Sequence, residues 1–126
     1  MAAFVFDTGA LIAIERGDRN VAAMLAAAAK DGTEARTSST CVAQVWRNPT
    51  RQARLARALA GFVECDLDAR AARDCGVLLA RNDTADIADA AVSLLASHGD
   101  TLLTSDPEDI KRLLDAAGTR ARIRPV

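Results

Sequence analysis

The sequence predicts an α/β fold in three layers, with a central parallel sheet of four to five strands flanked by helices. Short apolar segments typical of buried strands alternate along the chain with longer helix-forming segments, as expected for βαβ units. The 126 residues, 50% of them hydrophobic and 26% charged, have the size and composition of one globular domain. We therefore expect a single domain that spans residues 1–126.

The first half of the chain predicts two strands and three helical segments. These are a strand at 3–6, helices at 10–15 and 20–30, a strand at 35–38 and a helix from 41 to 59. The first strand is an apolar run that ends at Asp7, and the alanine-rich second helix ends before Gly32. Ser39 or Thr40 is a good N-cap for the third helix, which Asn48-Pro49 breaks or restarts.

The second half repeats the alternation. The expected elements are a strand at 62–67, helices at 68–81 and 86–97, a strand at 101–104, a helix at 107–117 and a possible edge strand at 122–126. Asp68 is a good N-cap, residues 82–85 form a turn, and His98-Gly99 closes the helix before the fourth strand.

Aspartates stand where a parallel sheet would bring them together. Asp7 follows the first strand and Asp106 follows the fourth, and sites in such sheets form outside the carboxyl ends of the strands. Asp86 and Asp89 share a helix face, and Asp89 borders an apolar stripe. We expect the buried side of this helix to comprise Ile87, Ala88, Ala91, Val92 and Leu95. Carboxylates gathered at neutral pH repel one another unless a cation neutralises them, so the pattern indicates a hard-metal site.

Structural roles are an alternative for these acids. Asp106, Pro107 and Asp109 also match an N-cap, a proline at the first helical position and an acid that closes a capping box. Asp86 in a first helical turn is most often a favourable partner of the helix dipole. Asp7 has no evident partner within its own segment.

Three blocks of the sequence, FVFDTGALIAIE, ADAAVSLLA and TLLTSDPEDI, resemble in order and spacing the acidic blocks of PIN-domain ribonucleases, specifically VapC-type toxins of VapBC toxin–antitoxin pairs. The resemblance covers almost the whole chain. It implies a PIN-like fold and a metal-dependent endoribonuclease whose carboxylates, Asp7, Asp89 and Asp106, bind magnesium or manganese. Asp109 and Asp86 would be auxiliary acids. It also implies a homodimer that a VapB-type antitoxin neutralises by covering the acidic pocket.

The family's second acid, a glutamate within a helix resembling VAEVWR, falls on Gln44 of VAQVWR. An amide there removes one negative charge, although its carbonyl oxygen can still serve as an auxiliary ligand. The resemblance therefore implies a toxin ribonuclease, and Gln44 predicts that its activity is attenuated. The alternative is a catalytically impaired PIN-like module that binds antitoxin or RNA without cleaving RNA.

Four arginines follow the Gln44 segment. Arg47, Arg51, Arg54 and Arg57 would share a broad face of one helix, and no acid occurs between Ala35 and Val63. Such a face suits contacts with an RNA backbone, and it is also typical of a solvated helix surface. Trp46 fits a core or interface position, and His98 fits a helix C-terminus.

Other classes are less consistent with the chain. A phospho-acceptor receiver domain needs paired acids after the first strand, where Asp7 stands alone, and a haloacid-dehalogenase-type phosphatase needs an acid at Gly9. Three cysteines without CxxC spacing argue against a zinc site or a disulfide framework. With no apolar run of 18 residues and no signal peptide, we expect a cytoplasmic protein that does not enter the membrane.

Overall fold

The computed structural model describes residues 2–126, which form one five-stranded sheet and seven helices. The strands are β1 (Phe4–Phe6), β2 (Ala35–Ser38), β3 (Val63–Cys65), β4 (Thr101–Thr104) and β5 (Arg122–Pro125). They are ordered β3-β2-β1-β4-β5, and every neighbouring pair is parallel. The predicted parallel sheet is confirmed, and the possible edge strand is β5.

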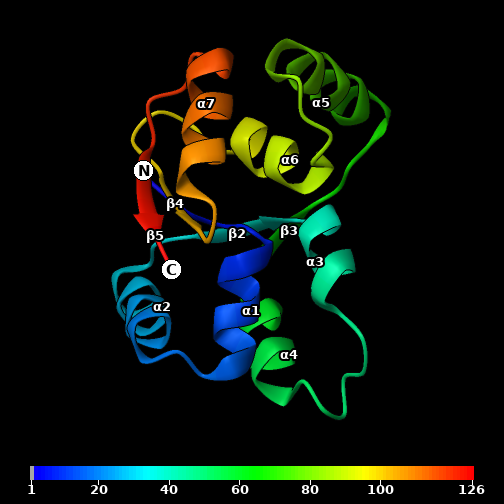
Figure 1. The fold of residues 1–126 in the computed structure, drawn as a ribbon. Coiled ribbons are helices and arrows are strands. Elements are labelled where there is room, and N and C mark those ends of the chain that lie inside the picture. The colour runs from blue at the N-terminus through cyan, green and yellow to red at the C-terminus, as the bar shows by residue number, and fades with distance from the viewer. Residues whose placement is uncertain (1) are drawn as a thin grey trace.

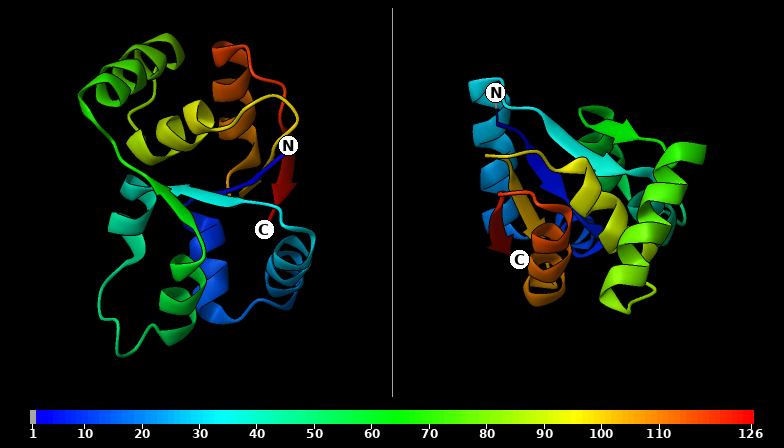
Figure 2. Two further views of the ribbon diagram at one scale, coloured as in Figure 1. Left: turned by 180° about the vertical axis from the view of Figure 1, so that it is seen from behind. Right: turned by 90° about the horizontal axis from the view of Figure 1, so that it is seen from above.

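The helices lie in two layers, one on each face of the sheet. They are α1 (Thr8–Arg16), α2 (Arg19–Asp31), α3 (Ser39–Val45), α4 (Ala53–Ala60), α5 (Ala69–Asn82), α6 (Ile87–Leu95) and α7 (Pro107–Ala117). Figure 1 shows α5, α6 and α7 above the sheet and α1, α2 and α4 below it, and the view from behind in Figure 2 shows the same two layers. The three-layer prediction is therefore confirmed.

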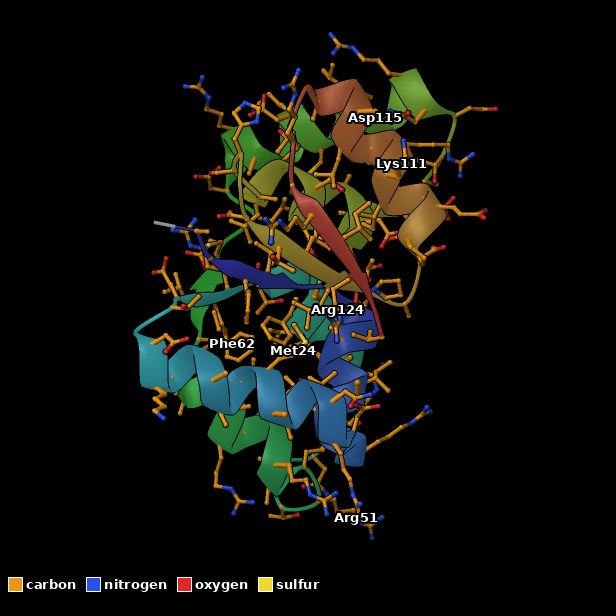
Figure 3. All side chains as sticks on the ribbon, turned by 90° about the vertical axis from the view of Figure 1, so that its left-hand side faces the viewer. Met24, Arg51, Phe62, Lys111, Asp115 and Arg124 are labelled. Carbon is orange, nitrogen blue, oxygen red and sulfur yellow. The ribbon has the colours of Figure 1, made fainter. Side chains whose placement is uncertain are left out.

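The main core fills the space between the sheet and these helices. Phe6 of β1, Leu11 of α1, Leu55 of α4 and Leu102 of β4 are fully buried there. Phe62 stacks at a tilt on Phe6, with 4.8 Å between ring centroids, and Figure 3 shows it on the α2 side of the sheet, like Met24. Within residues 2–126, no helix is long and apolar enough to cross a membrane.

The segment expected to be helical from 41 to 59, with a break or restart at Asn48-Pro49, is two helices, because the chain leaves helical geometry at Trp46 (φ −70°, ψ 123°), two residues before Asn48. Gln52, a buried side chain, holds the intervening segment 46–52. Its Oε1 accepts hydrogen bonds from the backbone N–H groups of Arg47 (2.8 Å) and Asn48 (3.0 Å). Its Nε2 donates to Glu15 Oε1 (2.6 Å) and to the Val45 carbonyl (2.8 Å).

The fourth strand is preceded by a shorter helix than expected. α6 ends at Leu95 rather than near Ser97. Ile87, placed on the buried side by the sequence, is 51% exposed, because the first residue of α6 lies at the surface. Residues 88–93 are buried without a break, since α6 packs against α5 and α7 as well as against β1, β2 and α3.

Candidate metal centre

The site lies where the strand order changes direction. The chain runs outward from β1 through β2 to β3, then returns to place β4 on the other side of β1. In such sheets a crevice opens between the carboxyl ends of the two strands that flank the switch. Phe6 of β1 is level with Leu103 of β4, and the Asp7 N–H donates to the Leu103 carbonyl (3.1 Å). Residues that follow these two strands are therefore neighbours.

Asp7 is almost fully buried at this switch point, with 2% of its surface exposed. Its Oδ1 accepts from the Ala10 N–H (2.8 Å), so it is the N-cap of α1, and its Oδ2 accepts from the Ser105 N–H (3.3 Å). The expectation that Asp7 lacks a partner in its own segment is wrong. Burial raises the pKa of Asp7, and hydrogen bonds from Thr104, Ala10 and Ser105 partly oppose that rise.

Three further aspartates form the acidic cluster: Asp89 of α6, Asp106 before α7 and Asp109 in the first turn of α7. One carboxylate oxygen from each lies within 4.8 Å of the others. Asp89 is 8% exposed, whereas Asp106 and Asp109 are half-buried. Ligand oxygens around a six-coordinate magnesium lie about 3–4 Å apart, so these donors fit a hard divalent cation with small adjustments.

Electrostatics within the cluster favour protonation or a cation. Burial, followed by the charges of Asp86, Asp7, Asp106 and Asp109, raises the pKa of Asp89 from 3.8 to about 7. Burial and the neighbouring Asp109 also raise the pKa of Asp106. A bound cation would favour the ionised form of each carboxyl group and so reverse these shifts.

The structure separates the capping role from the cluster. Asp106 occupies the N-cap position of α7, but its side chain makes no capping hydrogen bond within the described chain; its own N–H donates to Thr104 Oγ1 (2.8 Å). The capping box is therefore not formed by Asp106. Asp86 does cap its helix, because its Oδ1 accepts from the Asp89 N–H (2.9 Å). Asp86 thus holds the backbone of Asp89 at the start of α6.

Gln44 lies on the exposed side of α3 and reaches the start of α1. Its Oε1 accepts a hydrogen bond from Thr8 Oγ1. Since Thr8 directly follows Asp7, the amide is adjacent to the switch-point residues. The Gln44 side chain is exposed and is not packed into a protein core.

The predicted stripe of four arginines on one helix is wrong, because the chain breaks between α3 and α4. Arg47 lies in that break, where its Nη1 donates to the carbonyls of Ala43 (3.1 Å) and Trp46 (2.8 Å) and so caps the end of α3. Arg51 lies in the same break, and Figure 3 shows it far from α7. Only Arg54 and Arg57 belong to α4.

His98 and Trp46 lie outside the acidic cluster. His98 lies beyond α6, where its Nδ1 accepts from the Arg120 N–H (3.0 Å). Trp46, at the end of α3, is 36% exposed. Within residues 2–126, the three cysteines are free thiols.

Several contributors to the site have no strong sequence signal. Thr104 is fully buried and hydrogen-bonds towards both Asp106 and Asp7, although a threonine ending a strand is common. Gly9 allows Ser105 to approach α1: a Cβ on Gly9 would collide with the Ser105 side chain and lie 3.3 Å from its backbone nitrogen. Only the combination of strand-end positions with the final topology identifies these residues.

Comparison with known proteins bears on the fold. No family model matches the sequence, and no curated protein is detectably similar to it. A solved structure does match: a chain of VapBC2 from Rickettsia felis, in the crystal structure of VapBC2 bound to a DNA fragment from their promoter. The TM-score is 0.70 at 18% sequence identity, over 98% of each chain. The chain has the PIN-domain fold.

The PIN-domain fold accounts for the position of the acidic residues. Its strand order places the ends of β1 and β4 side by side, and α6 and α7 supply carboxylates from the face above the sheet. The right-hand view of Figure 2, from above, shows α6 over the central strands and α7 towards β5, in agreement with the contacts of α6 with β1 and β2 and of α7 with β5. The cluster therefore arises from the path of the chain and not from one local motif.

Proposed function

We propose that the chain is a divalent-metal-dependent endoribonuclease and acts, as a single domain, as the toxin of a toxin–antitoxin pair. The observation that carries this proposal is the acidic cluster of Asp89, Asp106 and Asp109, with Asp7 buried beside it, at the switch point of a PIN-domain fold. Four acids at one place, two of them nearly inaccessible to water, are costly in a fold unless they serve a cation.

Asp89, Asp106 and Asp109 would hold magnesium or manganese, and Asp7 would complete the anionic environment. A metal held there would supply the chemistry of polarising a phosphodiester and activating water for in-line attack. The chain's own residues fix the geometry: Asp86 anchors the backbone of Asp89, Thr104 anchors that of Asp106, and Asp7 fixes Ser105 against α1. Gln44 is an auxiliary residue held by Thr8.

Binding of Mn²⁺ measured by calorimetry tests the site. Asp89→Asn and Asp106→Asn should each weaken binding at least tenfold, because each loses a charged ligand. Asp7→Asn should weaken it less, since both Asp7 oxygens already accept backbone hydrogen bonds. Asp115→Asn, an exposed position on α7 away from the cluster, is the matched control and should bind as the wild type does. Wild-type affinity in the Asp89 and Asp106 variants would refute the assignment.

Gln44 favours a second candidate, an impaired PIN-like module that binds antitoxin or RNA without cleavage. An amide supplies no negative charge, and its carbonyl oxygen is already engaged by Thr8. Gln44→Glu distinguishes the candidates, because a carboxylate can accept the same hydrogen bond and also stabilise the cation. If Gln44→Glu cleaves RNA faster at an unchanged melting temperature, the chain is an attenuated ribonuclease. If Gln44→Glu is less stable and cleaves no faster, Gln44 is not part of the metal site.

The proposed partners are a VapB-type antitoxin, a second copy of the chain and RNA. The matching structure is of a VapBC2 complex, which supports a VapB-type antitoxin as partner. Exposed apolar side chains, including Trp46 and Val63 near α3 and β3 and Val77 and Leu94 on α5 and α6, support a homodimer. Arg54 and Arg57 are the proposed RNA-backbone contacts that share a helix, with Arg47 and Arg51 in the preceding loop. Light scattering that gives a monomer mass up to high concentration would exclude the dimer.

A further inference from the structure

Helix α7 carries two ion pairs from adjacent basic residues. Arg112 pairs with Asp109 three residues earlier, and Lys111 pairs with Asp115 four residues later at 3.1 Å. Figure 3 shows the Lys111–Asp115 pair on the outer surface of α7. Of the three ion pairs in residues 2–126, only that of Arg112 includes a member of the acidic cluster.

Arg112 also shares a hollow with the deeper part of the cluster. The small hollow beside the acids is lined by Asn82, Thr84, Asp89, Asp109, Arg112 and Leu113. Its walls come from the end of α5, the turn before α6, α6 itself and α7. Arg112 is thus both the partner of Asp109 and a neighbour of Asp89.

The positive charge of Arg112 lies beside the negative charges of the acidic cluster. Asp89, Asp106 and Asp109 repel one another, and the guanidinium at Asp109 offsets part of that repulsion. An oxygen of Asp109 that accepts from Arg112 is less available to a metal, because the hydrogen bond occupies a lone pair and the positive charge opposes a second cation. A metal must therefore displace the guanidinium, or share Asp109 with it.

We propose that Arg112 is an internal counter-cation of the acidic cluster and competes with the divalent metal for Asp109. This inference rests on the proposed metal-dependent function. Arg112 is a positioning residue: it sets how readily Asp109 becomes a metal ligand. Because the ion pair is partly exposed, with 68% and 43% of the two side chains accessible, its effect is modest.

Mn²⁺ titration by calorimetry at low ionic strength tests the competition. Arg112→Gln should bind Mn²⁺ about two- to fivefold more tightly than the wild type. Lys111→Gln is the matched control, because it removes the same charge from the next position of α7 and breaks a pair outside the cluster. Its affinity should equal that of the wild type. In an Asp109→Asn background, Arg112→Gln should leave the Mn²⁺ affinity unchanged, since the side chain at position 109 is then uncharged.

The outcomes separate this inference from the proposed function. Three results would overturn the competition and leave the metal site intact. Arg112→Gln could bind Mn²⁺ with wild-type affinity, Lys111→Gln could gain the same affinity, or the gain in affinity could persist in the Asp109→Asn background. Weaker binding in Arg112→Gln would show that the arginine holds Asp109 in the ligand orientation, which also overturns it. If neither the wild type nor Arg112→Gln binds Mn²⁺, the metal site and the competition fall together.

Discussion

Asp89 makes the metal-free protein sensitive to pH. Its pKa is raised from 3.8 to about 7 in the folded chain, first by burial and then by the charges of Asp86, Asp7, Asp106 and Asp109. The folded state therefore keeps a proton that the unfolded state releases near pH 4. Where the folded state binds more protons, stability falls as pH rises. The contribution of the protonated Asp89 to the free energy of unfolding is fully present below about pH 4 and is lost as pH rises through 7.

The size of the effect follows from the shift. A rise of about three pH units corresponds to at most ~4 kcal/mol. The cluster opens to solvent at Asp106 and Asp109, which screens part of the interaction, so we expect about 2 kcal/mol. The variant Asp89→Asn cannot ionise and is nearly equal in size. Without metal at pH 8 it should be about 2 kcal/mol more stable than the wild type, and near pH 4 the two should be similar.

Urea denaturation in the presence of EDTA, repeated from pH 4 to pH 8, measures this difference. Asp115→Asn is the control for loss of an exposed acid and should follow the wild type at every pH. Parallel stability curves for the wild type and Asp89→Asn across this range would refute the reasoning. Adding Mn²⁺ at pH 8 should stabilise the wild type and leave Asp89→Asn nearly unchanged, because only the former retains the ligand.

Two further predictions concern the scaffold. Replacing Gln52 with leucine should lower the free energy of unfolding by about 2–3 kcal/mol, because the loop amides and Glu15 lose their buried partner; urea denaturation measures this, and a change below about 0.5 kcal/mol would contradict the role of Gln52. Gly9→Ala should cost about 1–3 kcal/mol, because its Cβ collides with Ser105. Adding Ser105→Gly should recover part of that loss in thermal melts, and no recovery would place the strain elsewhere.

Much of the fold follows from local sequence signals. Strand 101–104 and helix 107–117 have the expected bounds, because Leu102 and Leu103 mark the strand and Pro107 marks the first helical residue. The break between α3 and α4 is harder to locate, because it depends on Gln52 reaching back to Val45 and across to Glu15. No periodicity in the sequence encodes such a tertiary contact, so the arginine stripe was wrong.

The candidate site is predictable in its members but not in its contacts. The strand-end rule brings Asp7 and Asp106 to one place, and the structure has them there. The rule could not reveal that both oxygens of Asp7 accept backbone hydrogen bonds, or that a carboxylate oxygen of Asp109 lies within 4.8 Å of those of Asp89 and Asp106. The bond to Ala10 is a local N-cap, whereas the bond to Ser105 joins positions 98 residues apart, so no local sequence signal encodes it.

Cleavage of a labelled single-stranded RNA tests the central claim most directly. The account predicts weak cleavage by the wild type in Mn²⁺, faster cleavage by Gln44→Glu because a carboxylate again supports the cation, and none with EDTA. Adding Asp106→Asn to the Gln44→Glu variant should abolish the gain, since it removes a ligand from the cluster. Two results would contradict a metal-dependent ribonuclease at this site. One is RNA cleavage that persists in EDTA or in the double variant. The other is a folded Gln44→Glu protein that binds Mn²⁺ and cuts no RNA.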